Sequence, residues 1–532
     1  MQAFAALLDR LVLTPQRNGK LQLLTDYFSA TPDPDRGYAV AAITRDLDFP
    51  SVKPAMLRSL IAERMDADLF ELSYNYVGDL AETISLTWPD KRGANRTPPL
   101  AEVVERLQEA KRAEAPNIVA NYLDMLDQPG RWALLKLVTG GLRIGVSARL
   151  AKTALARFGD KDITEIEELW HGLEPPYTDL FSWLEGAAEK PVNASAAPFR
   201  PVMLAHPIDE DKDLAGIAPD THAAEWKWDG IRVQAVVDSG ERRLYSRTGD
   251  DIGKAFPDII DALDFEAAID GELLVYDPQR DRFQPLPFSD LQQRLNRKTV
   301  TKKLLTSHPA FIRAYDVLTL NGEDLRPLPF AARREKLETF FEIAPPRRLD
   351  LSPLVPFTDA NALAAARANP PDDAIEGLMI KRLGAPYVPG RPKGEWWKWK
   401  REPYLIDAVM MYAQRGHGRR SSFYSDYTFG VWRDDEIVPV GKAYFGFTDE
   451  ELKQLDRFVR NNTTDRFGPV RQVKFGKTEG LVLEVAFEGL NRSKRHKSGV
   501  AMRFPRINRI RWDKPAAEAD QLETLEAMLP GP

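Results

Sequence analysis

The sequence predicts a multidomain protein: an all-α domain, then an α+β domain built from antiparallel sheets, then a C-terminal β-barrel. A chain of 532 residues is too long for one hydrophobic core and is better divided among several. Three observations predict the fold class. The first third has helical periodicity, the composition changes near residues 186–202, and short alternating runs closed by turn residues dominate from Ala224 onwards.

The N-terminal region is predicted to be helical because its apolar residues recur at intervals of three and four. Leu100, Val103, Val104, Leu107 and Ala110 have the spacing that places side chains on one helix face. Further helical stretches are predicted at 117–126, 132–138 and 147–158. The segment GAAEKPVNASAAPFRPV lacks this period and is rich in Ala and Pro, as linkers are. We therefore assign the first domain to residues 1–195.

The β-rich regions are predicted from alternating runs between turn signals. Ser239-Gly240 and Asn321-Gly322 each interrupt such a run, which predicts two hairpins. A helix is expected at 330–341. Further strands are expected at 406–413, 428–432 and 480–487, in a region about the size of a small five-stranded barrel. The predicted domains are thus α+β at 199–402 and a barrel at 403–515, followed by a short helical or frayed tail at 516–532.

Composition narrows the possible chemistry. Cysteine is absent, which excludes disulfides, thiolate zinc sites and a cysteine nucleophile. The net charge is −6, yet the segment 491–514 carries nine Lys or Arg and one acidic residue, so charge must be judged locally. There is no apolar run long enough to span a bilayer, and Asp9 and Arg10 interrupt what would have to be an uncharged signal segment. A soluble, cytoplasmic protein without membrane association is expected.

The first motif that carries chemistry is Glu225-Trp226-Lys227-Trp228-Asp229-Gly230, at the predicted end of a strand. A lysine amine attacks phosphorus only when it is unprotonated, so it needs desolvation or nearby cations. The two flanking tryptophans are candidates for the desolvation. By itself, this motif is more typical of a surface lysine before a turn.

Further candidate residues follow in an order that suits nucleotide chemistry. Arg247 offers a guanidinium for ribose or phosphate oxygens, and the strand residue Tyr315 an aromatic ring for a purine. Glu272 and Glu376 precede apolar strands and would make a pair for a hard cation. In Trp396-Trp397-Lys398-Trp399-Lys400, strand alternation points both lysines to one face, where they would grip a triphosphate. Each segment alone is also typical of an ordinary turn or core strand.

Together these segments resemble a known motif series. The order KWDGIR, SRTG, DGELLVYD, AYDVL, EGLMIK, WWKWK and RFPRINRIRWDK is similar to that of the covalent nucleotidyltransferases and, within them, the ATP-dependent DNA ligases. The match runs from about Phe199 to Lys514. The helical region, through TGGLRIG at 139–145, also resembles the ligase DNA-binding domain. The resemblance implies ATP-grasp-like antiparallel sheets for the nucleotidyltransferase domain and an oligonucleotide-binding (OB) fold for the barrel.

The resemblance also implies roles around the nucleoside. Lys227 would form the phosphoramidate to AMP, and Glu225 would read the adenine amine. Arg232 and Arg247 would contact the sugar and phosphates. Tyr315 would stack on adenine, at a position where such sequences often have Phe, so its hydroxyl is an addition of unknown role.

Other implied roles concern the phosphates and the metal. Glu272 would bind ribose or Mg²⁺, and Glu376 would be the second metal-binding carboxylate. Lys398 and Lys400 would hold the α-phosphate, and Arg391 would contact a phosphate. Arg511, in the last motif of the barrel, would orient the pyrophosphate leaving group.

The implied activity is the sealing of single-strand nicks in double-stranded DNA, with ATP as cosubstrate and Mg²⁺, for repair, recombination or replication. The protein is expected to act as a monomer, associated with the nucleoid. An RNA ligase or capping-type nucleotidyltransferase shares most of the central motifs and stays open as an alternative. An NAD-dependent ligase is disfavoured because its zinc module needs cysteine. A catalytically silent scaffold has no reason to keep several desolvated charges.

Overall fold

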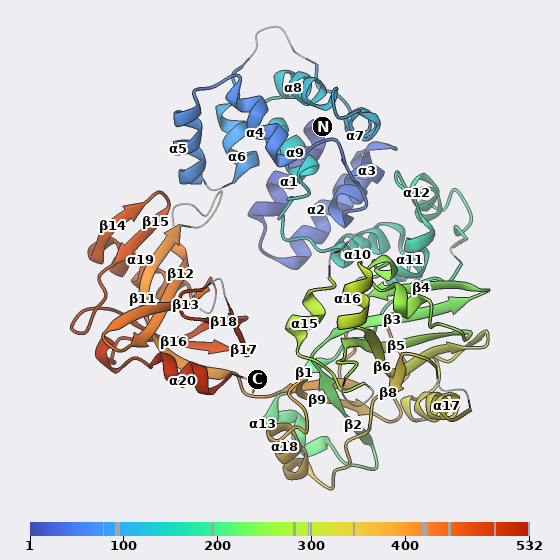
Figure 1. The fold of residues 1–532 in the computed structure, drawn as a ribbon. Helices are drawn as coiled ribbons and strands as arrows, with labels where there is room; N and C mark the ends of the chain where they lie inside the picture. Colours follow the sequence, from blue (N-terminus) through green and yellow to red (C-terminus); the bar gives the residue numbers. More distant parts are fainter. Residues whose placement is uncertain are drawn as a thin grey trace. The chain divides into compact units, whose positions relative to one another are not determined.

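The computed structural model describes residues 1–532 except 78, 91–95, 193–195, 280–282, 296, 298–299, 344–345, 416–423, 445–447, 494–495 and 530–532 (Figure 1). The chain divides into two compact units. The first contains Met1–Asp160, Glu174–Ala188 and Pro403–Pro532, and the second contains Lys161–Leu173 and Glu189–Glu402.

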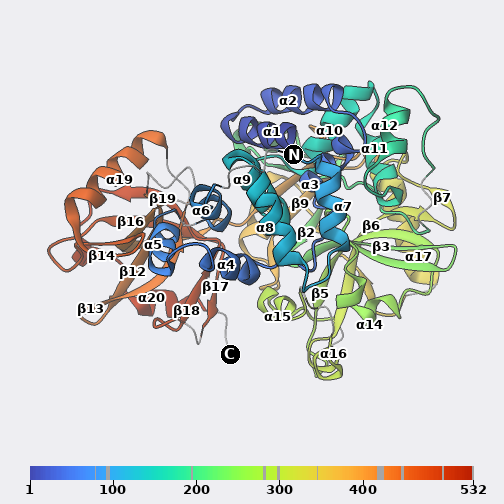
Figure 2. The ribbon, with the colours of Figure 1, turned by 90° about the horizontal axis from the view of Figure 1, so that it is seen from above.

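The N-terminal part of the first unit is helical. Its helices are α1 (Gln2–Leu13), α2 (Arg17–Ala30), α3 (Asp35–Thr44), α4 (Pro54–Ala62), α5 (Ala67–Val77), α6 (Leu80–Thr87), α7 (Leu100–Glu109), α8 (Ala115–Met125), α9 (Gln128–Val138), α10 (Ala148–Gly159) and α12 (Thr178–Leu184). Helix α2 contacts both α1 and α10 (Figure 2). Of the five apolar residues predicted for one helix face, the four within α7 are fully buried, and Ala110, which follows the end of the helix, is buried as well. The stretches predicted at 117–126, 132–138 and 147–158 are α8, α9 and α10.

Side chains fix the ends of several of these helices. The carboxylates of Asp79 and Asp127 and the hydroxyl of Ser147 accept hydrogen bonds from backbone N–H groups in the first turns of α6, α9 and α10. Such caps satisfy donors that a helix leaves unpaired. In the TGGLRIG motif, Lys20 donates to the carbonyls of Ile144 and Gly145, at 3.1 and 2.8 Å, and so ties this loop to α2.

The second unit is built on two sheets. A six-stranded sheet has the order β4-β3-β5-β6-β7, with β8 beside β6, and a four-stranded sheet has the order β1-β10-β9-β2. The strands are β1 (His206–Pro207), β2 (His222–Trp228), β3 (Ile231–Asp238), β4 (Glu241–Ser246), β5 (Ala267–Val275), β6 (Ala310–Leu320), β7 (Glu323–Asp324), β8 (Leu349–Leu351), β9 (Ile375–Arg382) and β10 (Trp396–Lys400). Most neighbouring strands are antiparallel; β1 with β10 and β8 with β6 are parallel.

Short helices accompany these sheets. They are α11 (Ile163–Leu169), η1 (Trp170–Gly172), α13 (Glu210–Asp213), η2 (Leu214–Gly216), η3 (Gly253–Ala255), α14 (Pro257–Ile260), α15 (Phe288–Gln292), α16 (Lys302–Ser307), α17 (Phe330–Ile343) and α18 (Ala360–Ala368). Helix α17, predicted at 330–341, packs on β6 and buries Leu337 in the core of the six-stranded sheet (Figure 1). Both predicted hairpins are present. Ser239 and Gly240, and Asn321 and Gly322, have the positive φ angles that tight hairpin turns require.

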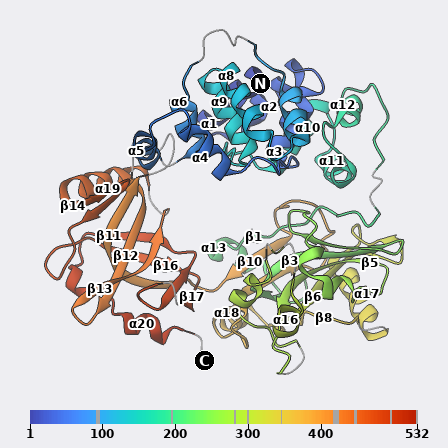
Figure 3. The same cartoon turned by 45° about the horizontal axis from the view of Figure 1, so that its top comes forward.

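The C-terminal part of the first unit, over its described residues, forms a seven-stranded antiparallel sheet of order β13-β12-β11-β15-β14, in which β16 pairs with β11 and β19 with β16; β17 and β18 form a separate hairpin. The elements are β11 (Tyr404–Arg415), β12 (Tyr424–Arg433), β13 (Glu436–Ala443), α19 (Asp449–Asn462), β14 (Thr463–Phe467), β15 (Val470–Val473), β16 (Val482–Phe487), β17 (Gly489–Arg492), β18 (Val500–Arg503), β19 (Arg506–Arg511), η5 (Ala516–Glu518) and α20 (Leu522–Ala527). Helix α19 contacts β12 and β15, and Figure 3 shows the helix beside this sheet.

This part has more strands than the predicted five, because β11 pairs successively with β16 and β15 along one edge and with β12 along the other. The tail is also better ordered than a frayed end. Leu522 and Leu525 of α20 are buried in the core of this sheet, and Asp520 exchanges backbone hydrogen bonds with neighbours at Asp407 and Trp432. Among the described residues, no helix has the length and hydropathy of a membrane span.

Candidate active site

The candidate site is built on three neighbouring strands of the four-stranded sheet. In the register of β2, β9 and β10, Lys227 lies opposite Gly377, and Gly377 lies opposite Lys400. Gly377 has a φ of 147°, and a Cβ there would overlap the carbonyl of Trp399. A glycine is therefore required at this position, and it lets the two lysine-bearing strands approach the strand that carries Glu376.

Glu376 joins the two lysines. One carboxylate oxygen contacts the Nζ of Lys227, and the other lies 3.1 Å from the Nζ of Lys400. The exposed fractions are 22% for Lys227, 23% for Glu376 and 39% for Lys400, so the cluster is half-buried but open to a ligand. Burial alone would raise the pKa of Glu376, but the two ammonium groups outweigh it and hold the pKa below its usual value. The carboxylate is ionised at neutral pH.

The tryptophans beside Lys227 have a different role from the predicted one. Trp228 is buried in an apolar cluster with Leu274 and Phe311, and Trp226 packs against it. The sequence predicted that the two indoles would desolvate the amine. The structure instead puts the Glu376 carboxylate in contact with it, because adjacent residues of a strand point to opposite faces.

Glu272, on β5, is the other predicted metal-binding carboxylate. Burial and the negative charge of Glu376 raise its pKa to about 8, although Lys227 and Arg232 act in the opposite direction. The residue therefore binds a proton at neutral pH in the absence of ligand. A carboxyl group held in this way is ready to exchange its proton for another cation.

Additional cations surround this cluster. The pKa of Lys398 is lowered by burial and by the charges of Arg391, Lys227, Lys400 and Arg247. Burial and the charges of Arg232 and Arg391 likewise lower the pKa of Arg247. These mutual effects show that the predicted phosphate-binding residues of this unit lie within electrostatic range of one another. Such an excess of positive charge suits a polyanionic ligand.

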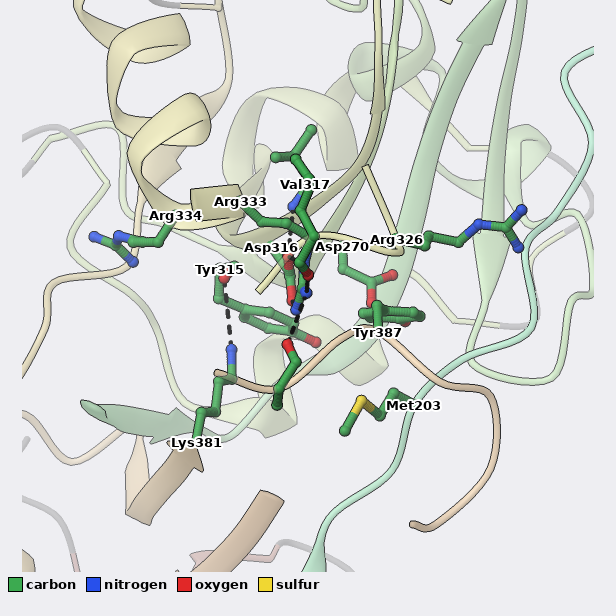
Figure 4. A network of polar contacts seen from close by, with 12 residues as sticks. Met203, Asp270, Tyr315, Asp316, Val317, Arg326, Arg333, Arg334, Lys381 and Tyr387 are labelled. Atoms are coloured by element: carbon green, nitrogen blue, oxygen red, sulfur yellow. Dashed lines mark hydrogen bonds and ion pairs between the residues drawn. The ribbon is translucent and has the colours of Figure 1, made fainter. Parts of the chain in front are cut away.

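The predicted base-binding residues form an adjoining group. The Nζ of Lys381 lies 4.9 Å from the ring centroid of Tyr315, on β6. Figure 4 shows Lys381 donating to the backbone carbonyl of Tyr315. Glu225 is only 2% exposed, and its carboxylate lies 2.6 Å from Lys381 and 3.3 Å from Arg334. Glu225 is thus neutralised by two buried cations. The sequence did not single out Lys381 or Arg334, although Lys381 is the last residue of the EGLMIK segment.

Arg232, on β3, is held by a buried polar network. Its terminal nitrogens donate to Asp270 (2.6 Å), to the hydroxyl of Tyr387 (3.0 Å) and to the carbonyl of Met203 (2.6 Å). Asp270 belongs to the segment DGELLVYD, but Tyr387 was not predicted. Tyr387 lies between the EGLMIK and WWKWK motifs, where the sequence predicted a role for Arg391 alone.

Arg511 is the one predicted site residue outside the second unit. It lies at the end of β19, where Asp407 and Asp513 contact its guanidinium at 3.1 and 2.9 Å. The other predicted site residues all belong to the second unit.

The carboxylates of Glu272 and Glu376 are compatible with the way in which nucleotide-dependent enzymes bind a magnesium ion. Among the described residues, no cluster of three or more His, Asp or Glu side chains is arranged to hold a metal. Mg²⁺ in such enzymes usually takes one or two carboxylates and completes its shell with substrate phosphates and water. Glu272 and Glu376 are two carboxylates, a number compatible with that donor set.

A strand lysine that contacts a carboxylate, with further cations and a neighbouring group of buried aromatic and charged side chains, is suited to carrying a nucleotidyl group. The fold and the site thus define a nucleotidyltransferase. Residues 202–400 match the family model described as ATP dependent DNA ligase domain, and residues 420–514 match the ATP dependent DNA ligase C terminal region. The chain belongs to the ATP-dependent DNA ligase family.

Individual relatives agree with this family. The chain is 30% identical to "Probable DNA ligase" of Koribacter versatilis (strain Ellin345), over 99% of this chain and 96% of the relative. It is 33% identical to "Probable DNA ligase" of Anaeromyxobacter sp. (strain Fw109-5), over 80% of this chain and 82% of the relative. The solved structure titled "Pmar-Lig_PreS3" has a TM-score of 0.59 at 15% identity and covers 96% of this chain and 99% of its own, so it shares the fold.

Proposed function

We propose that this ATP-dependent DNA ligase seals nicks in duplex DNA through three phosphoryl transfers, with Lys227 as the temporary carrier of AMP. The observation that supports this best is the contact of Lys227 with Glu376 and, through it, with Lys400. The family match favours a DNA ligase over the RNA ligase or capping-type alternative.

In the first transfer, the amine of Lys227 attacks the α-phosphorus of ATP and displaces pyrophosphate. The amine reacts only in its unprotonated form, so its contact with the ionised Glu376 has to open first. Glu272 and Glu376 would hold Mg²⁺, which supplies positive charge to the phosphate oxygens. Lys398 and Lys400 would hold the α-phosphate, where cations lower the energy of the developing charge.

In the second and third transfers, AMP passes from Lys227 to the 5′-phosphate at the nick, and the 3′-hydroxyl then attacks that phosphate and releases AMP. The base-binding roles belong to Glu225 and Tyr315. Arg232, Arg247 and Arg391 would contact the sugar and phosphates. Arg511 would orient pyrophosphate during the first transfer.

The remaining parts of the chain would bind DNA. We assign residues 1–195 to a DNA-binding domain, 199–402 to the adenylation domain and 403–515 to an OB-fold domain, with α20 in the tail that packs on it. The basic segment 491–514 supports phosphate contacts, which fix position without reading bases; its Lys494 and Arg495 lie outside the described residues. A monomer acting at the nucleoid is the simplest form of such an enzyme.

Lys227→Ala is expected to abolish the covalent adduct, because alanine has no amine to attack the α-phosphorus and Lys227 is the proposed nucleophile. Purified protein is incubated with ATP and Mg²⁺, and its intact mass is measured for the addition of AMP. Lys303→Ala, which removes an exposed lysine of the same unit, is the control and keeps the adduct. An adduct that persists on Lys227→Ala would assign the nucleophile elsewhere. Sealing of nicked duplex with ATP, dATP, GTP and NAD in parallel then tests the cosubstrate.

A further inference from the structure

The guanidinium of Arg232 is almost fully engaged within the protein. One terminal nitrogen donates to both Asp270 and Tyr387, and the other donates to the carbonyl of Met203. The Nε is buried and has no hydrogen-bond partner among the described residues. Because protein atoms cover this N–H, it is not a donor that a ligand oxygen reaches in this structure. Of the five guanidinium N–H groups, these contacts leave the second hydrogen of the nitrogen that donates to Met203 for a ligand.

Tyr387 is the residue that completes this arrangement. Its hydroxyl donates to Asp270 at 2.5 Å and accepts from Arg232, and the residue is 3% exposed. Asp270 is fully buried and also accepts from Gln234 at 3.3 Å. Figure 4 shows Tyr387, Asp270 and Met203 together around this point. Burial and the charge of Asp270 raise the pKa of the Tyr387 phenol, so it remains a donor at any working pH.

The backbone around Tyr387 is also fixed. The N–H of Tyr387 donates to the carbonyl of Arg326 at 2.8 Å. Three residues further on, Gly390 exchanges backbone hydrogen bonds with Val202 and Leu204, at 3.0 and 2.6 Å. The loop between β9 and β10 is thus attached on both sides of the phenol. The same loop carries Arg391, which lies within electrostatic range of Lys398.

We propose that Tyr387 is a positioning residue for nucleotide binding: its phenol, together with Asp270, fixes the guanidinium of Arg232 so that the terminal nitrogen bonded to Met203 presents its second N–H to a nucleotide oxygen. The inference rests on the proposed function of this site. Because the nitrogen bound to Asp270 and Tyr387 uses both its hydrogens, Arg232 cannot offer its two terminal nitrogens together as a fork. It offers a single directed bond, and its direction depends on the phenol.

The test is a double-mutant cycle on ATP affinity. Tyr387→Phe, Arg232→Met and the double variant are compared with the unsubstituted protein by calorimetric titration with ATP, with divalent metal removed by a chelator so that AMP is not transferred. Tyr387→Phe keeps the ring and removes only the hydroxyl. It is expected to weaken ATP binding about tenfold, the factor for a hydrogen bond of about 1.4 kcal/mol. In the Arg232→Met background the same substitution should change affinity less than about twofold.

The control is Tyr177→Phe, which removes another phenol that is 3% exposed and donates to a carboxylate, Asp46, at 2.6 Å in the first unit. It should lower thermal stability as Tyr387→Phe does while leaving ATP affinity unchanged. Losses that multiply in the double variant, or equal losses of affinity in Tyr177→Phe, would overturn the proposal. The unsubstituted protein is also incubated with ATP and Mg²⁺. If it gains AMP while the losses multiply, only the role of Tyr387 fails; if it gains none, the proposed function fails as well.

Discussion

At the scale of single residues, lysine and arginine side chains outnumber the carboxylates around Lys398. Lys227 and Lys400 share one carboxylate, whereas Lys398 lies among Arg391, Arg247 and these lysines. Its lowered pKa follows from burial and from this crowding of like charges. A bound triphosphate would offset the repulsion between these lysine and arginine side chains. This repulsion destabilises the unliganded folded protein, and its removal on binding strengthens the affinity for ATP.

The lowered pKa of Lys398 predicts a pH dependence. Lys398 must be protonated to hold a phosphate, so kcat/KM for adduct formation should fall as pH rises through a value below the ordinary lysine value of about 10.4. Lys398→Arg should move this alkaline limb to higher pH, because a guanidinium does not titrate in that range. The rate of adduct formation with ATP, measured across pH 7–11 (an approximate range chosen around those values), checks the shift. An identical limb in both proteins would assign it to another group.

The pKa of Glu272 is shifted in the opposite direction from that of Lys398. Its raised pKa, about 8, means that the folded protein binds a proton there that the unfolded chain loses at lower pH. Between the ordinary carboxyl value and pH 8, this residue therefore makes the folded state less stable as pH rises. A buried carboxyl that costs stability is typical of a residue kept for ligand binding.

At the scale of elements, strand alternation explains how one segment serves two purposes. In β10, Trp397 and Trp399 pack in the same apolar cluster, while Lys398 and Lys400 take the alternate positions of the strand. The cluster fixes the strand, and the strand fixes the spacing of the lysines. Precise placement of cations by a rigid element is what transition-state stabilisation requires.

The terminal helix α20 gives a prediction at this scale. Leu525 is fully buried in the core beneath the C-terminal sheet. Leu525→Ala should lower the free energy of unfolding by about 2–5 kcal/mol, because it removes apolar contacts and leaves a cavity. Urea unfolding followed by tryptophan fluorescence checks this value, and Trp432 lies in the sheet next to the tail. Glu526→Ala, at an exposed position of the same helix, is the control and should change stability by less than about 0.5 kcal/mol.

For the whole molecule, the overall charge is a poor guide to the ligand. The net charge is −6, but acidic and basic residues are unevenly distributed along the chain. Arg509, in the basic segment, is 60% exposed although it pairs with Glu484. Contacts of such residues with DNA phosphates release counterions, so affinity depends on salt through local contacts rather than through net charge.

DNA binding is therefore expected to weaken steeply with salt. If six or more phosphates are contacted, affinity for a nicked duplex should fall roughly 10³-fold or more between about 50 and 200 mM salt. Fluorescence anisotropy with a labelled nicked duplex, repeated at several salt concentrations, gives the slope. A flat response would remove the phosphate contacts from the proposal.

Local patterns were sufficient for the secondary structure and for most candidate residues. Helices α8, α9 and α10, both hairpins and the strand β10 lie where periodicity and turn residues predicted them. The candidate site residues of the second unit were predicted because each belongs to a short motif. The strand number of the C-terminal sheet was wrong, because one long strand pairs with several partners and this pairing has no local signal.

The sequence by itself determined the lysine, the carboxylates and the alternation that carries the cations, since these depend on residue type and on spacings of a few positions. Only the tertiary structure decided which residues contact one another. Lys227 contacts Glu376 rather than an indole. Glu225 pairs with Lys381, and Arg232 donates a hydrogen bond to Tyr387. Arg232 and Tyr387 are 155 residues apart in the chain. Their contact depends on strand register and on how a loop is anchored, and these follow from packing over the whole unit.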